Sequence, residues 1–137
     1  MLFPWTTSMD EQVGILSKTL TVSIELLYGK IDTLFDQFSI ENTDFITNLE
    51  YVSIHAPFLG QDGKNFLYEK NTVTKNVLNH LKDIHYHYNA KHIVFHPDLI
   101  IDFHLIENMG VKILLENLPA NSGYKNEELT EIFKKFP

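Results

Sequence analysis

The chain of 137 residues contains no cysteine. This absence excludes thiol catalysis, thiolate metal sites and disulfide bonds, and it makes a reducing compartment, the cytoplasm, the simplest expectation. There is also no basic, apolar leader and no run of about 18 apolar residues, so we expect neither secretion nor a membrane-spanning helix. Positive charge is scarce, because 11 Lys and Arg stand against 18 Asp and Glu. The net charge of -7 disfavours nucleic-acid binding in general.

The apolar content is high enough for one core, because 44% of the residues are hydrophobic. No linker, repeat or low-complexity segment divides the chain, so we expect a single domain over residues 1–137. Short apolar runs alternate with segments of helical periodicity, which is typical of an α/β fold with one parallel sheet. The strands are predicted at residues 2–6, 21–27, 51–55, 92–96 and 111–116.

Helices are predicted between the strands. Ser8 and Glu11 have the spacing of a capping box, which begins a helix that reaches about Leu20. Apolar residues at helical spacing from Val73 to Tyr88 predict the longest helix. Residues 31–38 suggest a short helix, whereas 39–47 are interpreted as a loop or a broken helix.

The last two helices are predicted near the C-terminal part of the sequence. Asp98 is expected to cap an apolar helix that stops at Gly110. A final helix is expected to reach Pro137.

Three predicted strands end in the same way, with a side chain able to bind metal and then a turn containing proline. The side chains are His55, His96 and Glu116. Because the carboxyl ends of parallel strands lie on one rim, these three should converge there, within about 8 Å. Two imidazoles and a carboxylate suit Zn, Mn, Fe or Co. The alternative is that each is merely a polar residue where a strand meets solvent.

Three further residues are candidates for contact with a substrate. Glu25 lies late in the second predicted strand, either at the rim or one residue short of it, and it could equally be an active-site acid or a solvated charge at the rim. Trp5 could stack on a sugar ring, although a large aromatic residue near a barrel mouth more often serves packing. Asn117 could orient Glu116 or a substrate hydroxyl, or it could be a turn residue.

The segments Ser53-Ile-His55-Ala-Pro57-Phe58, Val94-Phe95-His96-Pro97 and Leu114-Leu115-Glu116-Asn117 follow one another on successive strands. In this order they resemble the xylose isomerase-like TIM barrels, from the first predicted strand to the last helix. The resemblance implies that Glu116 is the metal-binding Glu of the fifth strand. It also implies that His55 and His96 contact metal or substrate.

The chain is predicted to contain fewer βα units than a complete barrel of this family. A complete barrel has eight βα units and about 250 residues, whereas five units are predicted here. We therefore expect a partial barrel that is inactive as this chain alone, with a divalent metal (Zn, Mn, Mg or Co) bound weakly or not at all. The implied function is that of a metal-dependent sugar or sugar-phosphate isomerase or epimerase. Glu116, His55 and His96 would be both its ligands and its catalytic residues.

Two other functions remain open. The first is an endonuclease IV-like zinc phosphodiesterase that acts on abasic DNA, which the acidic net charge disfavours. The second is a half-barrel that binds a partner without catalysis. For the leading hypothesis the partner is a small sugar or sugar phosphate. Because an incomplete barrel leaves apolar interior side chains and strand edges open, we also expect a homodimer through the open barrel face.

Overall fold

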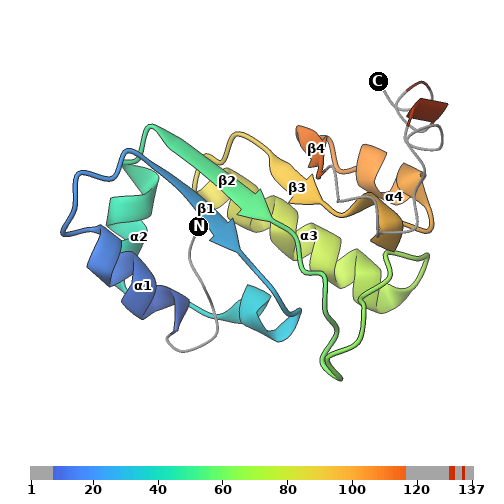
Figure 1. The fold of residues 1–137 in the computed structure, drawn as a ribbon, viewed down its shortest axis with the longest axis horizontal. Helices are drawn as coiled ribbons and strands as arrows, with labels where there is room; N and C mark the ends of the chain where they lie inside the picture. Colours follow the sequence, from blue (N-terminus) through green and yellow to red (C-terminus); the bar gives the residue numbers. More distant parts are fainter. Residues whose placement is uncertain (1–7, 117–129, 132–133, 135–137) are drawn as a thin grey trace.

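The computed structural model describes residues 8–116, 130–131 and 134. Within these residues four strands form one sheet, in which every neighbouring pair is parallel and the order follows the sequence (Figure 1). The α/β class with a parallel sheet is therefore confirmed, and the strand expected at 2–6 lies outside the described residues. The strands are β1 (Ser23–Leu27), β2 (Tyr51–His55), β3 (Ile93–Phe95) and β4 (Ile113–Leu115).

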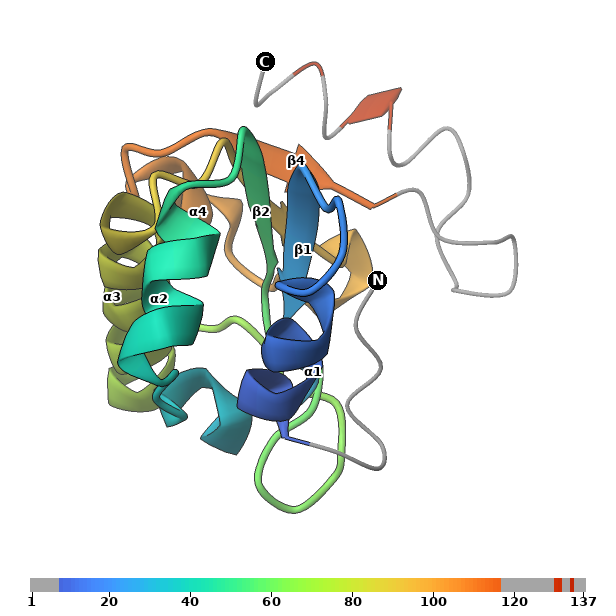
Figure 2. The ribbon, with the colours of Figure 1, turned by 90° about the vertical axis from the view of Figure 1, so that its left-hand side faces the viewer.

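Helices cover one face of this sheet. Figure 2 shows α2 and α3 together on the same side of the strands. Leu26, Ile54 and Ile93 are aligned across β1, β2 and β3, and all three are inaccessible to solvent. The helices are α1 (Met9–Leu16), α2 (Ile40–Thr47), α3 (Thr72–His87) and α4 (Phe103–Glu107), with short 3-10 helices η1 (Asp32–Phe35) and η2 (Pro97–Leu99).

The opposite face of the sheet carries the alternate residues. Leu27, His55, Val94 and Leu114 occupy one row across the four strands, because Leu27 aligns with His55, His55 with Val94, and Val94 with Leu114. All four line one open cavity. Successive side chains of a strand point to opposite faces, so Glu25, two residues before Leu27, lies on this face as well.

The longest helix, α3, forms where the spacing of apolar residues predicts it. Asn71 caps its N-terminus by accepting a hydrogen bond from the Thr74 amide, with an N···O distance of 2.8 Å. Val77 and Leu81 lie on its buried face. None of the helices in the described ranges is both long enough and apolar enough to cross a membrane.

Two of the expected helices differ in the structure. The helix that begins at Ser8 ends at Leu16 and not at Leu20, although its capping box is present. The interpretation of residues 39–47 as a loop or broken helix is wrong, since these residues form Ser39-capped α2. The side-chain amide of Asn42 in α2 donates two hydrogen bonds to Asp10. Asn42 Nδ2 lies 2.7 Å from the backbone oxygen of Asp10 and 2.6 Å from its Oδ1.

The segment after β3 also differs. Asp98 does not cap a helix, because it lies inside η2, and Asp102 caps α4 by accepting a hydrogen bond from the His104 amide. Gly110 does follow this helix, with a φ of +68° that favours glycine. The final helix expected up to Pro137 falls largely outside the described residues.

Candidate metal centre

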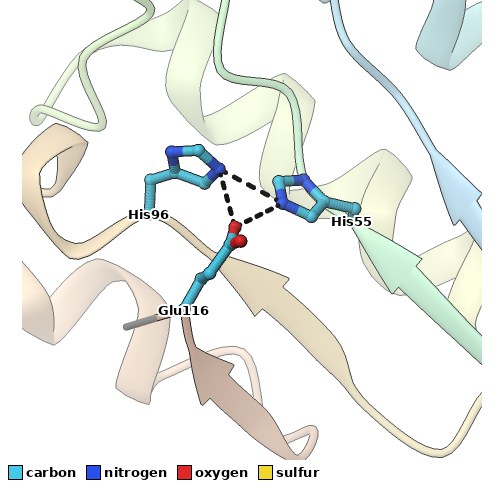
Figure 3. A group of neighbouring side chains, drawn as sticks. All are labelled: His55, His96 and Glu116. Atoms are coloured by element: carbon cyan, nitrogen blue, oxygen red, sulfur yellow. Dashed lines mark hydrogen bonds and ion pairs between the residues drawn. The ribbon is translucent and has the colours of Figure 1, made fainter. Parts of the chain in front are cut away.

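His55, His96 and Glu116 meet at the carboxyl ends of three neighbouring strands. His55 is the last residue of β2, and His96 and Glu116 directly follow β3 and β4. Glu116 Oε2 lies 3.1 Å from His55 Nε2 and 3.0 Å from His96 Nε2, and the two Nε2 atoms are 3.2 Å apart. Figure 3 shows the three side chains pointing toward one another. The expected convergence within about 8 Å is therefore present.

The three side chains differ in exposure. The side chain of His55 is 8% exposed and that of His96 is 20% exposed, whereas the side chain of Glu116 is 46% exposed. The cluster thus has a buried side, formed by the imidazoles, and an open side at the carboxylate. Such an arrangement leaves room for a further ligand to approach from solvent.

The orientation of the His55 ring is fixed by its other nitrogen. Nδ1 lies 3.0 Å from the Ala56 carbonyl oxygen, which can only accept a hydrogen bond, so Nδ1 carries the proton. In the neutral imidazole Nε2 then carries a lone pair, and it faces Glu116 Oε2 at 3.1 Å. Two lone-pair atoms this close require a proton or a metal ion between them. A backbone carbonyl that fixes the tautomer in this way is common behind metal-binding histidines.

The spacing of the three donor atoms fits a small divalent ion. With bond lengths of about 2.05 Å, neighbouring ligand atoms lie about 2.9 Å apart at 90° and about 3.3 Å apart at the tetrahedral angle. The observed separations of 3.0, 3.1 and 3.2 Å fall between these values. Within the described part of the chain this is the only group of three such donors, with all of its ligand atoms within 4.8 Å of one another.

Charged neighbours act on His96 in opposite directions. Burial lowers the pKa of His96, and the nearby His55 ring lowers it further. The carboxylates of Glu116 and Asp98 oppose this change and raise the pKa. Asp98 Oδ1 is itself buried and has no hydrogen-bond partner among the described residues. The surroundings of His96 therefore favour its neutral, metal-binding form while supplying negative charge for a cation.

An open cavity of about 490 Å³ lies over the three side chains. Glu25 lines this cavity from β1. The Ser53 hydroxyl donates a hydrogen bond of 3.4 Å to Glu25 Oε2. The remaining candidates, Trp5 and Asn117, lie outside the described residues.

Sequence reasoning missed Phe58 and Asp98 as neighbours of the histidines. Phe58 directly follows the His55-Ala56-Pro57 segment, and its ring packs against both imidazoles, with centroid distances of 5.9 Å to His55 and 5.4 Å to His96. The signal was its position after Pro57, but the sequence alone does not indicate where its ring points.

Comparisons with known proteins give no further assignment. No protein-family model matches the chain, and neither the curated proteins nor the solved structures contain a match.

Proposed function

We propose that the chain is the metal-binding part of an enzyme similar to the sugar and sugar-phosphate isomerases and epimerases. His55, His96 and Glu116 would hold one divalent ion, Zn, Mn, Mg or Co. The proposal rests on the convergence of three donor atoms within 3.0 to 3.2 Å at the ends of neighbouring parallel strands. The corresponding fold is a partial barrel of about five βα units, in which β1 to β4 would be the second to fifth strands.

The donor set is suited to this chemistry. A bound divalent ion supplies a positive charge that stabilises the negative charge developing on substrate oxygens when a neighbouring carbon loses a proton. Glu116 and the two imidazoles bind on one side only, and the exposed side of Glu116 faces the cavity. Substrate hydroxyl groups would enter from that side.

Glu25 is the carboxylate best placed to bind substrate hydroxyl groups. It lines the cavity, and no ion pair neutralises it among the described residues. Among the described residues, Ser53 is the donor to this carboxylate, and it occupies Oε2. Oε1 is then left to accept a hydrogen bond from a substrate hydroxyl or to hold a proton.

Turnover is expected to need more than these residues. Three ligands leave a divalent ion with open coordination positions, and the cavity above them is open to solvent. Stabilisation of transition-state charge depends on a site that excludes water. We therefore propose metal and substrate binding, without measurable isomerase turnover by these residues alone.

Calorimetric titration with ZnCl2 and MnCl2 tests the metal centre. We expect one bound ion per chain and a loss of affinity of about 100-fold or more in Glu116→Gln, because a ligand is removed. Glu107→Gln is the matched control, since Glu107 also lies 3.0 Å from a histidine nitrogen, on the exposed surface. Tight binding that persists after alanine replacement of His55, His96 and Glu116 together would overturn the assignment.

Sugar binding tests the second half of the proposal. In the Mn²⁺-loaded protein, fructose 6-phosphate should change the relaxation rate of water protons in a saturable manner, and EDTA should abolish the effect. Calorimetric binding of fructose 6-phosphate that is equally strong in the presence of EDTA would place the sugar away from the metal. The absence of any binding, for glucose 6-phosphate as well, would reject a sugar-phosphate substrate.

A second candidate, the zinc phosphodiesterase of the endonuclease IV type, is favoured by one observation. Both histidines present Nε2 to the same point, as two zinc ligands would. The net charge of -7 argues against approach to a DNA backbone. Zinc-dependent cleavage of a duplex with an abasic site would favour this candidate over the isomerase.

A further inference from the structure

A second cavity of about 480 Å³ lies where η1 and the residues after it meet α2 and the C-terminal half of α3. Among the described residues it shares no lining residue with the cavity over the metal centre. A smaller cavity of about 270 Å³ shares Tyr28 and residues 36–38 with it. Figure 2 shows α2 and α3 on the face of the sheet that carries the helices, so this cavity belongs to that side.

Aromatic rings form much of the wall of this second cavity. Phe35 is 54% exposed and lies beside the His80 ring, with centroids 4.7 Å apart. Phe38 contacts the edge of Tyr88, with centroids 5.9 Å apart and ring planes at 88°. The faces of such rings attract cations, and their surfaces also pack against methylene groups.

Two carboxylates complete the wall, and no lysine of the described residues lines it. Asp36 and Asp83 both contribute to the cavity. Neither forms an ion pair with another described residue. In a protein with a net charge of -7, this combination gives the cavity a negative potential that favours cations.

The side chain of Tyr28 also lines the cavity. Tyr28 is 1% exposed, yet it lines both the second cavity and its smaller neighbour. Within the described ranges its hydroxyl makes no hydrogen bond. Burial raises the pKa of Tyr28, and Tyr88 and Asp36, which also line the cavity, raise it further. The neutral phenol is therefore left to accept or donate a hydrogen bond inside the cavity.

A single metal ion does not fit these groups. In the part of the chain that the structure describes, three ligand atoms come within 4.8 Å of one another only at the metal centre. The carboxylates and imidazoles of the second cavity are thus too dispersed for one ion. Dispersed acceptors with aromatic surfaces between them match an elongated organic cation better.

We propose that the second cavity binds a linear aliphatic ammonium ion with at least two amino groups, as in a polyamine. Asp36 and Asp83 would each pair with one ammonium group. The Tyr28 hydroxyl would accept an N–H hydrogen bond. Phe35, Phe38 and Tyr88 would cover the methylene chain. This binding does not depend on the metal centre.

Calorimetry with spermidine on the full chain, at constant ionic strength, is the test. We expect saturable binding, with affinity reduced about threefold to tenfold in each of Asp36→Asn and Asp83→Asn because one charge-assisted contact is lost. Tyr28→Phe removes only the hydroxyl and should weaken binding by a similar factor. Glu50→Gln is the control, since it removes one negative charge from an exposed position outside the cavity.

Three outcomes would overturn the proposal. The first is the absence of saturable spermidine binding. The second is an equal loss of affinity in Glu50→Gln and in the two aspartate variants, which would indicate general attraction to an acidic surface. The third is full affinity in Tyr28→Phe together with equally tight binding of tetramethylammonium, which donates no hydrogen bonds. Circular dichroism of each variant establishes that it is folded.

Discussion

The ring of Phe58 stacks on the imidazole of His96, with centroids 5.4 Å apart and ring planes 15° from parallel. The same ring meets His55 edge on, at 83°. One aromatic side chain thus restricts the rotation of both imidazoles. Restricting ligand rings before the ion arrives favours binding, because less rotational freedom is lost.

Replacement of Phe58 by leucine tests this positioning role. Phe58→Leu keeps an apolar side chain but loses the flat surface, so we expect zinc affinity to fall about tenfold. The free energy of unfolding should fall by less than about 1.5 kcal/mol. Calorimetry and urea denaturation measure the two effects separately.

Phe45→Leu is the control for this experiment. Phe45 is partly buried against the core and lies far from the strand ends in α2. The same substitution there should change stability but leave zinc affinity within about twofold, because it does not touch a ligand. Unchanged zinc affinity in Phe58→Leu would show that the stacking does not position His96.

Glu25 should affect sugar binding without affecting metal binding. Glu25→Gln keeps the size of the side chain and can still accept the hydrogen bond from Ser53, but it loses the charge. We expect the affinity of the Mn²⁺-loaded protein for fructose 6-phosphate to fall about threefold to tenfold. Mn²⁺ affinity should stay within about twofold, because Glu25 is not among the three clustered ligands. Water-proton relaxation measures both constants, and a tenfold loss of Mn²⁺ affinity would instead make Glu25 a ligand.

The position of the site could be predicted from the sequence because short patterns of adjacent residues mark the strand ends that carry it. An apolar run that ends at a histidine followed by a proline marks the end of a strand, and this holds at His55 and near His96. Parallel order then brings those ends together without knowledge of any single contact. The orientation of the Nε2 atoms and the exposure of Glu116 depend on packing, so only the structure provides them.

Other features depend on contacts between distant residues and were missed for that reason. Helix α2 has a weak apolar pattern, with Ile40 exposed and only Asn42 and Ile46 buried. Hydrogen bonds from Asn42 to Asp10, 32 residues away, stabilise it. The sequence of residues 39–47 by itself does not indicate that Asp10 is a hydrogen-bond partner. The Ser39 cap was the one local signal for a helix.

The difference between Asp98 and Asp102 can be tested by substitution. Asp102 accepts a hydrogen bond of 3.1 Å from the His104 amide at the N-terminus of α4. Asp102→Ala should therefore lower the free energy of unfolding by about 1 kcal/mol. Asp98→Asn should cost less, because Asp98 Oδ1 has no partner to lose among the described residues. Urea denaturation decides, and a larger loss for Asp98→Asn would contradict the assignment of Asp102 as the cap.

Stability should depend on pH through His85 and His92, which are not among the three clustered metal-binding side chains. Burial lowers the pKa of both His85 and His92, and the proximity of the two rings lowers the pKa of His85 further. His92 Nδ1 also lies 3.1 Å from the Tyr51 hydroxyl. Since an unfolded histidine has a pKa of about 6.5, the unfolded chain binds more protons than the folded chain just below that pH. The free energy of unfolding must therefore rise with pH in this window.

We accordingly expect full stability above about pH 7 and a decline as the pH falls through about 6.5 toward the lowered folded-state values. Asp10, whose pKa is lowered by hydrogen bonds from Asn42 and Ser39, adds a separate loss only below about pH 4.

Urea denaturation at pH 7.5, 6.5 and 5.5, in the presence of EDTA, measures the first decline. The double variant His85→Gln, His92→Gln should flatten it, with the remainder due to His96, whose pKa is also lowered by burial. An unchanged slope in the double variant would assign the pH dependence to other groups.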